Sequence, residues 1–132
     1  MKSLNNFIES FINLELIDET NCYGHYPFQM FVENEDNTNQ INSLALGGDV
    51  ASCYRLFAKN KNNNAKRIYF SLDFPSGGDI ENYFVCVISY ENNEINLIAI
   101  PYNVNTGERF DIIEESTHLS EIKNQLMFYV NR

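Results

Sequence analysis

An eight-residue apolar run limits the folds open to this chain more than any other feature of its sequence. Residues 83–90, which read YFVCVISY, are apolar on nearly both faces of a strand, so a strand here needs cover on each side. Residues 68–74, IYFSLDF, alternate instead between large apolar and more polar side chains, the pattern of a strand with one buried face. The two segments predict a sheet in which residues 83–90 form the central strand.

Further strands are expected on either side of this pair. Residues 28–33 and 40–46 flank the polar stretch 33–39 and predict two strands that pair antiparallel. Residues 95–102 return from the central strand through Asn92-Asn93, a pair that tolerates the positive φ of a tight hairpin turn. After a turn at 105–107, residues 110–113 predict a short edge strand that carries Phe110, Ile112 and Ile113.

Apolar residues at helical spacing predict three helices. The first covers residues 3–17, the second begins after Gly47-Gly48 with Asp49 as its N-cap, and the third has Thr117 as its N-cap. Their apolar stripes are Leu4, Phe7, Ile8, Phe11 and Ile12; Val50, Cys53, Tyr54 and Phe57; and Leu119, Ile122, Leu126 and Tyr129. The sequence therefore predicts one α+β domain over residues 1–132: an antiparallel β-meander of four to six strands with an N-terminal, a middle and a C-terminal helix packed on it.

The chain is strongly acidic, with 18 Asp and Glu against 9 Lys and Arg and a formal net charge of -9. This charge disfavours nucleic acid and an anionic membrane as partners and favours a basic protein. No apolar run approaches the ~18 residues of a membrane helix, and the N-terminus lacks the uninterrupted apolar run of a secretory signal. The odd number of cysteines, three, argues against a disulfide framework, so we expect a cytoplasmic protein.

Two acidic clusters are the candidate partner-binding residues. The first is Glu33, Glu35 and Asp36, and the second is Asp111, Glu114 and Glu115. One interpretation is that they are solvated turns, with acids near a helix N-terminus favoured by the helix dipole. The other is an acidic docking surface, which speeds association and selects among partners. All five bases of residues 37–75 lie between residues 55 and 67, a weak signal for phosphate or RNA.

No stretch of the chain carries a catalytic, cofactor or metal motif. Cys22 and His25 lie three residues apart, but a closed zinc site needs four ligands, and no Lys or Arg stands nearby to lower the thiol pKa for a nucleophile–base dyad. The chain is therefore expected not to be an enzyme and to need neither metal nor cofactor. An alternative is a small-molecule-binding or enzymatic α+β domain whose pocket uses Cys22, His25 and Asp73.

Size, charge, class and the lack of catalytic motifs together suggest a binding protein. In this profile the chain resembles small acidic immunity proteins of bacterial toxin–immunity systems, a resemblance of kind that rests on no shared motif. It implies a cytoplasmic inhibitor that neutralises a basic toxin, for example a nuclease, by direct binding. A self-associating accessory domain is a further alternative, so the expected state in solution is a monomer or a weak homodimer.

Overall fold

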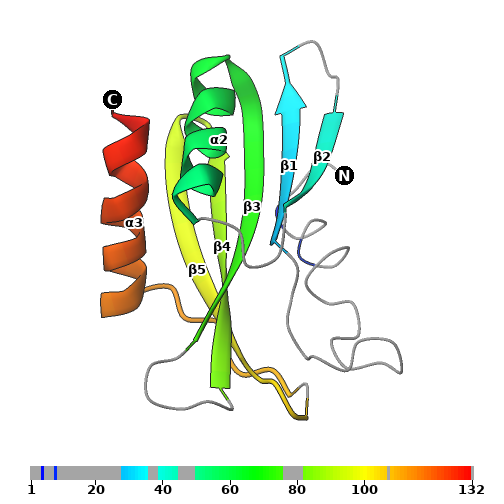
Figure 1. Cartoon of the computed structure of the whole chain (residues 1–132), viewed down its shortest axis with the longest axis vertical. Coiled ribbons are helices and arrows are strands. Elements are labelled where there is room, and N and C mark those ends of the chain that lie inside the picture. Colours follow the sequence, from blue (N-terminus) through cyan, green and yellow to red (C-terminus); the bar gives the residue numbers. More distant parts are fainter. Residues whose placement is uncertain are drawn as a thin grey trace.

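A five-stranded antiparallel sheet forms one layer of the computed structural model, and two helices form a second layer (Figure 1). The structure describes residues 28–35, 39–44, 50–75, 82–106 and 108–131, together with Leu4 and Ile8. The strands are β1 (Phe28–Asn34), β2 (Asn39–Leu44), β3 (Ala65–Pro75), β4 (Asn82–Glu91) and β5 (Glu94–Asn103), and the helices are α2 (Val50–Asn62) and α3 (Thr117–Val130). The predicted α+β class is confirmed, and two of the three expected helices lie within the described residues.

The strand order is β2-β1-β3-β4-β5, and every neighbouring pair is antiparallel. Strands β3, β4 and β5 form the predicted meander, but a meander through all strands is wrong, because β3 pairs with β1 and not with β2. The 13 residues of α2, at a rise of ~1.5 Å each, carry the chain about 20 Å back along the sheet. Strand β3 then runs in the same direction as β2, so its antiparallel partner is β1.

Residues 83–90 form an inner strand, as their apolar character predicts. All side chains from Phe84 to Tyr90 in β4 are buried, and β4 is paired on both sides, whereas the middle position of the sheet belongs to β3. The turn from β4 to β5 has positive φ at Asn92 (54°) and Asn93 (63°), as the hairpin prediction requires.

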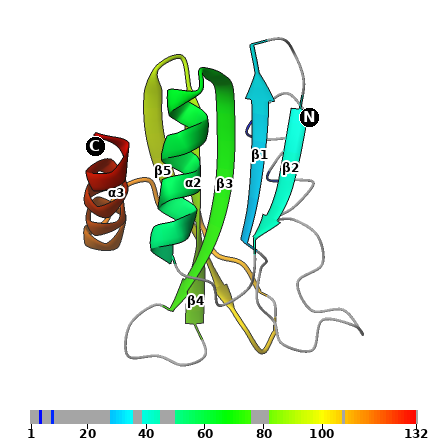
Figure 2. The same ribbon diagram turned by 45° about the horizontal axis from the view of Figure 1, so that its top comes forward.

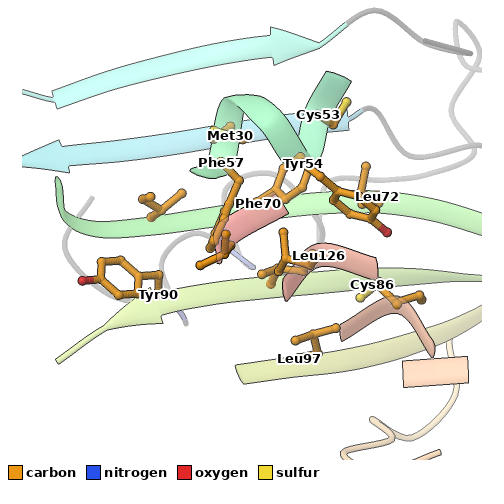
Figure 3. Packing of buried hydrophobic residues seen from close by; sticks show 14 of the residues in the cluster. Met30, Cys53, Tyr54, Phe57, Phe70, Leu72, Cys86, Tyr90, Leu97 and Leu126 are labelled. Carbon is orange, nitrogen blue, oxygen red and sulfur yellow. The ribbon is translucent and has the colours of Figure 1, made fainter. Parts of the chain in front are cut away.

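Both helices pack on the same face of the sheet, where they lie side by side (Figures 1 and 2). Figure 3 shows side chains of α2 and α3 meeting those of the strands in the core between the two layers, with Phe57 of α2 against Phe70 of β3 at a ring-centroid distance of 6.2 Å. The predicted stripe of α2 is confirmed, since Cys53, Tyr54 and Phe57 are buried. The buried residues of α3 are Leu119, Ile122, Leu126 and Val130.

Helix α3 begins one residue away from the predicted cap. Ser116 is the N-cap, and its Oγ accepts a hydrogen bond from the Leu119 amide at 3.1 Å. Thr117 is instead the first helical residue. Either hydroxyl can cap a helix, and Ser116 has the extended backbone that an N-cap needs (φ -164°, ψ 166°).

The opposite face of the sheet is also buried, which corrects the prediction of one buried face for residues 68–74. Tyr69 and Ser71 of β3 are fully buried on this second face, while Ile68, Phe70 and Leu72 face the helices. The second cluster of buried residues is Phe31, Tyr69, Val85, Val87, Ile100 and Tyr102. Leu4 and Ile8, from the predicted first helix, pack against it, and the rest of residues 3–17 lies outside the described residues.

Neither α2 nor α3, the helices in the described part of the chain, is long and apolar enough to span a membrane.

Candidate protein-docking site

Beyond β5 the chain turns back and runs along the outer edge of the sheet, as the orange stretch between β5 and α3 in Figure 1. It pairs antiparallel with β5 through Tyr102–Arg109 and Ala99–Ile113 bridges. The backbone hydrogen bonds are Asn103 N–Glu108 O (2.9 Å), Phe110 N–Pro101 O (2.9 Å), Ala99 N–Ile113 O (2.8 Å) and Ile113 N–Ala99 O (2.9 Å). The predicted edge strand at residues 110–113 is thus present as backbone pairing.

This pairing is interrupted, so the segment is not a regular strand. Phe110 pairs opposite Pro101 and Ile113 opposite Ala99, which leaves Asp111 and Ile112 opposite the single residue Ile100. One extra residue on one strand is a β-bulge, which bends the strand and redirects its side chains. The predicted short edge strand at residues 110–113 is therefore irregular.

The result is an exposed surface segment, residues Phe110–Glu115, which we call the acidic-apolar strip. Phe110, Ile112 and Ile113 keep 46%, 51% and 40% of their surface exposed, and Asp111, Glu114 and Glu115 are exposed as well. Residues 108–121 hold five acids and one base. Apolar side chains grouped on a surface with carboxylates around them are typical of a protein-binding site.

Two hollows adjoin the strip at Ser116. One is apolar, has a volume of about 200 Å³, and is lined by Phe84, Ala99, Pro101, Ile113, Ser116 and His118. The other is more polar, has a volume of about 380 Å³, and is lined by Asn96, Leu97, Glu114, Glu115, Ser116, Leu119, Ser120 and Lys123. The strip therefore borders both a small apolar depression and a carboxylate-lined one.

The first acidic cluster is arranged differently. The Glu33 side chain is buried (9% exposed). Its Oε1 lies 3.4 Å from Lys66 Nζ, and its Oε2 lies 3.7 Å from Arg67 Nε. Its charge is therefore largely compensated within the chain. Glu35 is exposed, and Asp36 lies outside the described residues.

Near Glu33, the carboxylate of Glu91 accepts a hydrogen bond from the buried Tyr69. The Tyr69 hydroxyl donates to Glu91 Oε2 at 3.0 Å. Burial, and then this hydrogen bond to a carboxylate, raise the pKa of Tyr69 well above its usual value. The acids in this part of the sheet serve internal contacts as well as facing solvent.

The described acids of the two clusters lie in different parts of the sheet. Across the sheet, Glu33 of β1 is in register with Arg67 of β3, Glu91 of β4 and Glu94 at the start of β5. Ile113 of the strip pairs with Ala99, which lies five residues further along β5 than Glu94. From β1 to the strip there are four inter-strand steps, about 19 Å, and the offset along the strands is about 17 Å. Among the described residues, the structure therefore does not bring Glu33 and Glu35 into one surface with the acids of the strip.

Four of the five bases between residues 55 and 67 make contacts within the fold. The Arg55 guanidinium lies 5.4 Å from the Tyr129 ring centroid, and the Lys61 ammonium lies 5.4 Å from that of Tyr90. Lys66 and Arg67 contact Glu33. These contacts account for most of the basic window without a polyanion.

The alternative ligand site is not assembled within the described residues. Cys22 and His25 lie outside them. The buried Tyr102 hydroxyl donates to the Asp73 carboxylate, 2.6 Å from Oδ1 and 2.7 Å from Oδ2. The structure thus places Asp73 as the acceptor of a buried tyrosine.

The two described cysteines are structural. Cys53 and Cys86 are free thiols buried in the core between the helices and the sheet. Burial raises the pKa of Cys86 to about 12, so the thiol stays protonated and unreactive. Within the described ranges, no three His, Cys, Asp or Glu side chains come together in a way that would hold a metal ion.

Comparisons of the chain with protein-family models, with curated proteins and with solved structures found no match. The interpretation of the strip therefore depends on its own residues. Sequence reasoning found its acids but assigned its apolar residues to a strand. The available signal was the order Phe-Asp-Ile-Ile-Glu-Glu, which fits neither strand nor helix periodicity.

Proposed function

We propose that the protein binds a basic protein through the acidic-apolar strip, and that it acts as an immunity- or antitoxin-type inhibitor of a basic toxin. The observation that carries the proposal is the joint exposure of Phe110, Ile112 and Ile113 with Asp111, Glu114 and Glu115 on one sheet edge. Apolar side chains at the centre of an interface supply most of its affinity, while surrounding charges steer the encounter and reject wrong partners.

The acidic balance of the whole chain supports a basic partner. A net charge of -9 attracts a cationic surface over about one Debye length, ~8 Å at physiological salt, and the strip concentrates that charge beside apolar contacts. A nuclease is basic where it holds its nucleic acid, so an acidic protein that covers that surface, or binds beside it, blocks the substrate. This mechanism needs no catalytic group on the inhibitor.

A matched pair of charge reversals tests which part of the sheet binds. Glu114→Lys alters the strip and Glu94→Lys alters an exposed acid in the register row of Glu33, and both change the net charge equally. The partner is first captured from the source cells at low and moderate salt, identified, purified and titrated with each variant. We expect Glu114→Lys to lower the association rate constant about tenfold and Glu94→Lys to change it little, with the difference shrinking as salt rises.

The reverse result, a loss with Glu94→Lys alone, moves the docking surface away from the strip to the end of the sheet where β5 begins. No loss with either variant refutes docking through these acids. For the inhibitory role, expression of the captured partner alone should arrest growth, and co-expression of this protein should restore it. A partner that is harmless when expressed alone rules out toxin inhibition.

A further inference from the structure

The apolar hollow beside the strip has a simple origin in the sequence. On the helix-facing side of β5, Ala99 pairs with Cys86 of β4, so two small side chains meet where larger ones fill the space on either side. The first turn of α3 starts beyond them and leaves a depression of about 200 Å³. A cavity of ~150 Å³ lined by apolar side chains is enough to hold a benzene ring. The hollow is therefore large enough for one aromatic or branched aliphatic side chain.

Rings line one wall of this hollow. The Phe84 ring lies 5.6 Å from that of Phe74, with 29° between the planes, and 5.7 Å from that of His118, with 40°. Phe84 is buried and fixed in the core, whereas His118 is exposed at the rim. An aromatic guest can pack against rings already held in place, which keeps the entropy cost of binding low.

Carboxylates line the neighbouring hollow, which shares Ser116 with the apolar one. Ile113 and Ser116 both line the apolar hollow, and Glu114 and Glu115 connect these two residues. The same two glutamates line the adjoining polar hollow, where Lys123 is the base among the lining residues. Two carboxylates against one ammonium favour a cation next to the apolar depression.

We infer that the strip recognises a partner segment in which one large apolar side chain is flanked by Lys or Arg. The apolar side chain enters the hollow of Phe84, Ala99 and Pro101, and a neighbouring cation lies with Glu114 and Glu115. This inference rests on the proposed function and specifies the chemistry of the partner. An apolar anchor with charges around it is the arrangement in which a few central residues supply most of the affinity of a protein interface.

Short peptides test the inference on the full chain. The probes are two capped heptapeptides, Gly-Lys-Lys-Phe-Lys-Lys-Gly and the same peptide with Ala in place of Phe. Backbone amide shifts are followed by NMR during titration at low salt. We expect the Phe peptide to bind about tenfold more tightly, since it buries one more aromatic side chain, and to shift Ile113, Ser116 and His118.

Two matched tryptophan substitutions locate the anchor. Ile113 lines the hollow, whereas Phe128, an exposed apolar residue of α3 outside the strip, lines neither hollow. Ile113→Trp should fill the depression and remove the preference for Phe over Ala. Phe128→Trp should leave that preference intact, and the dispersion of the spectrum shows that both variants are folded.

The outcomes separate the anchor from the docking surface. Equal binding of the two peptides, with shifts at Glu114 and Glu115, overturns the apolar anchor and leaves acidic docking standing. Absence of shifts at the strip with either peptide also overturns the anchor, and the titration of the captured partner then decides the proposed function independently. A preference for Phe that survives Ile113→Trp places the aromatic side chain elsewhere and likewise overturns it.

Discussion

Replacing Tyr102 by Phe is the sharpest test of the second face of the sheet. The Tyr102 hydroxyl is buried and lies 2.6 and 2.7 Å from the two carboxylate oxygens of Asp73. The substitution removes this hydroxyl and keeps the ring. The ring contact with Tyr83, at 6.3 Å between centroids, can persist. A hydrogen bond to a charged group contributes about 1.5–3 kcal/mol to the free energy of unfolding. At ~2.1 cal/mol/K per residue, the 132 residues translate this into a fall in Tm of about 5–11 °C.

Urea denaturation at pH 7, read by circular dichroism, gives the free energy of unfolding of each variant. The matched control is Tyr90→Phe, which removes a neutral hydrogen bond to Asn93 Oδ1 at 3.3 Å and should cost about 0.5–1 kcal/mol. The m-value should stay constant in both variants. A loss of less than about 0.5 kcal/mol for Tyr102→Phe refutes the assigned bond. It would also return Asp73 to the set of groups available for a ligand.

Two further predictions concern buried titratable groups. When the folded protein is treated with iodoacetamide at pH 8, Cys53 and Cys86 should remain unmodified, and both should react in urea, as peptide mass spectrometry can show. If either thiol of the folded protein reacted as fast as an exposed thiol, its burial would be contradicted. The pKa of Tyr69 is higher in the folded protein than the unfolded value of 10.0, so its contribution to stability is fully present below pH 10. Above that pH, the free energy of unfolding of the wild type should fall by about 1.4 kcal/mol per pH unit through this residue. Urea titrations at pH 9 and 11 should therefore show a smaller alkaline loss for Tyr69→Phe, and an equal loss would rule out this contribution.

Local patterns predicted most of the elements. The apolar run 83–90, the stripe Cys53-Tyr54-Phe57 and the Asn92-Asn93 turn depend on residues a few positions apart, so their structures follow from the sequence alone. The position of β1 between β2 and β3 depends on where α2 returns the chain. No local pattern specifies that, and the simple meander was the wrong prediction.

Charge and exposure were predictable only in part. The exposure of Asp111, Glu114 and Glu115 follows from their charge, because a cluster of acids before a helix is usually solvated. Glu33 looked like the start of a solvated turn, but its cations Lys66 and Arg67 are more than 30 residues away along the chain. Ile112 was predicted to lie in a short edge strand. The order Asp111-Ile112-Ile113 departs from strand alternation, but it does not show where the bulge falls or that Ile112 is left exposed.

The pairing of β1 with β3 has a consequence for how the chain folds. Phe31 and Tyr69 meet although 38 residues separate them, whereas the β4–β5 hairpin closes between Glu91 and Glu94. Loop-closure entropy disfavours the longer closure by about 2 kcal/mol, so we expect β3–β5 to form before β1 docks. Until β1 arrives, β3 presents a long, apolar, unpaired edge on which another chain can add a strand. The faster the β1–β2 hairpin closes over that edge, the shorter the time in which another chain can add to it.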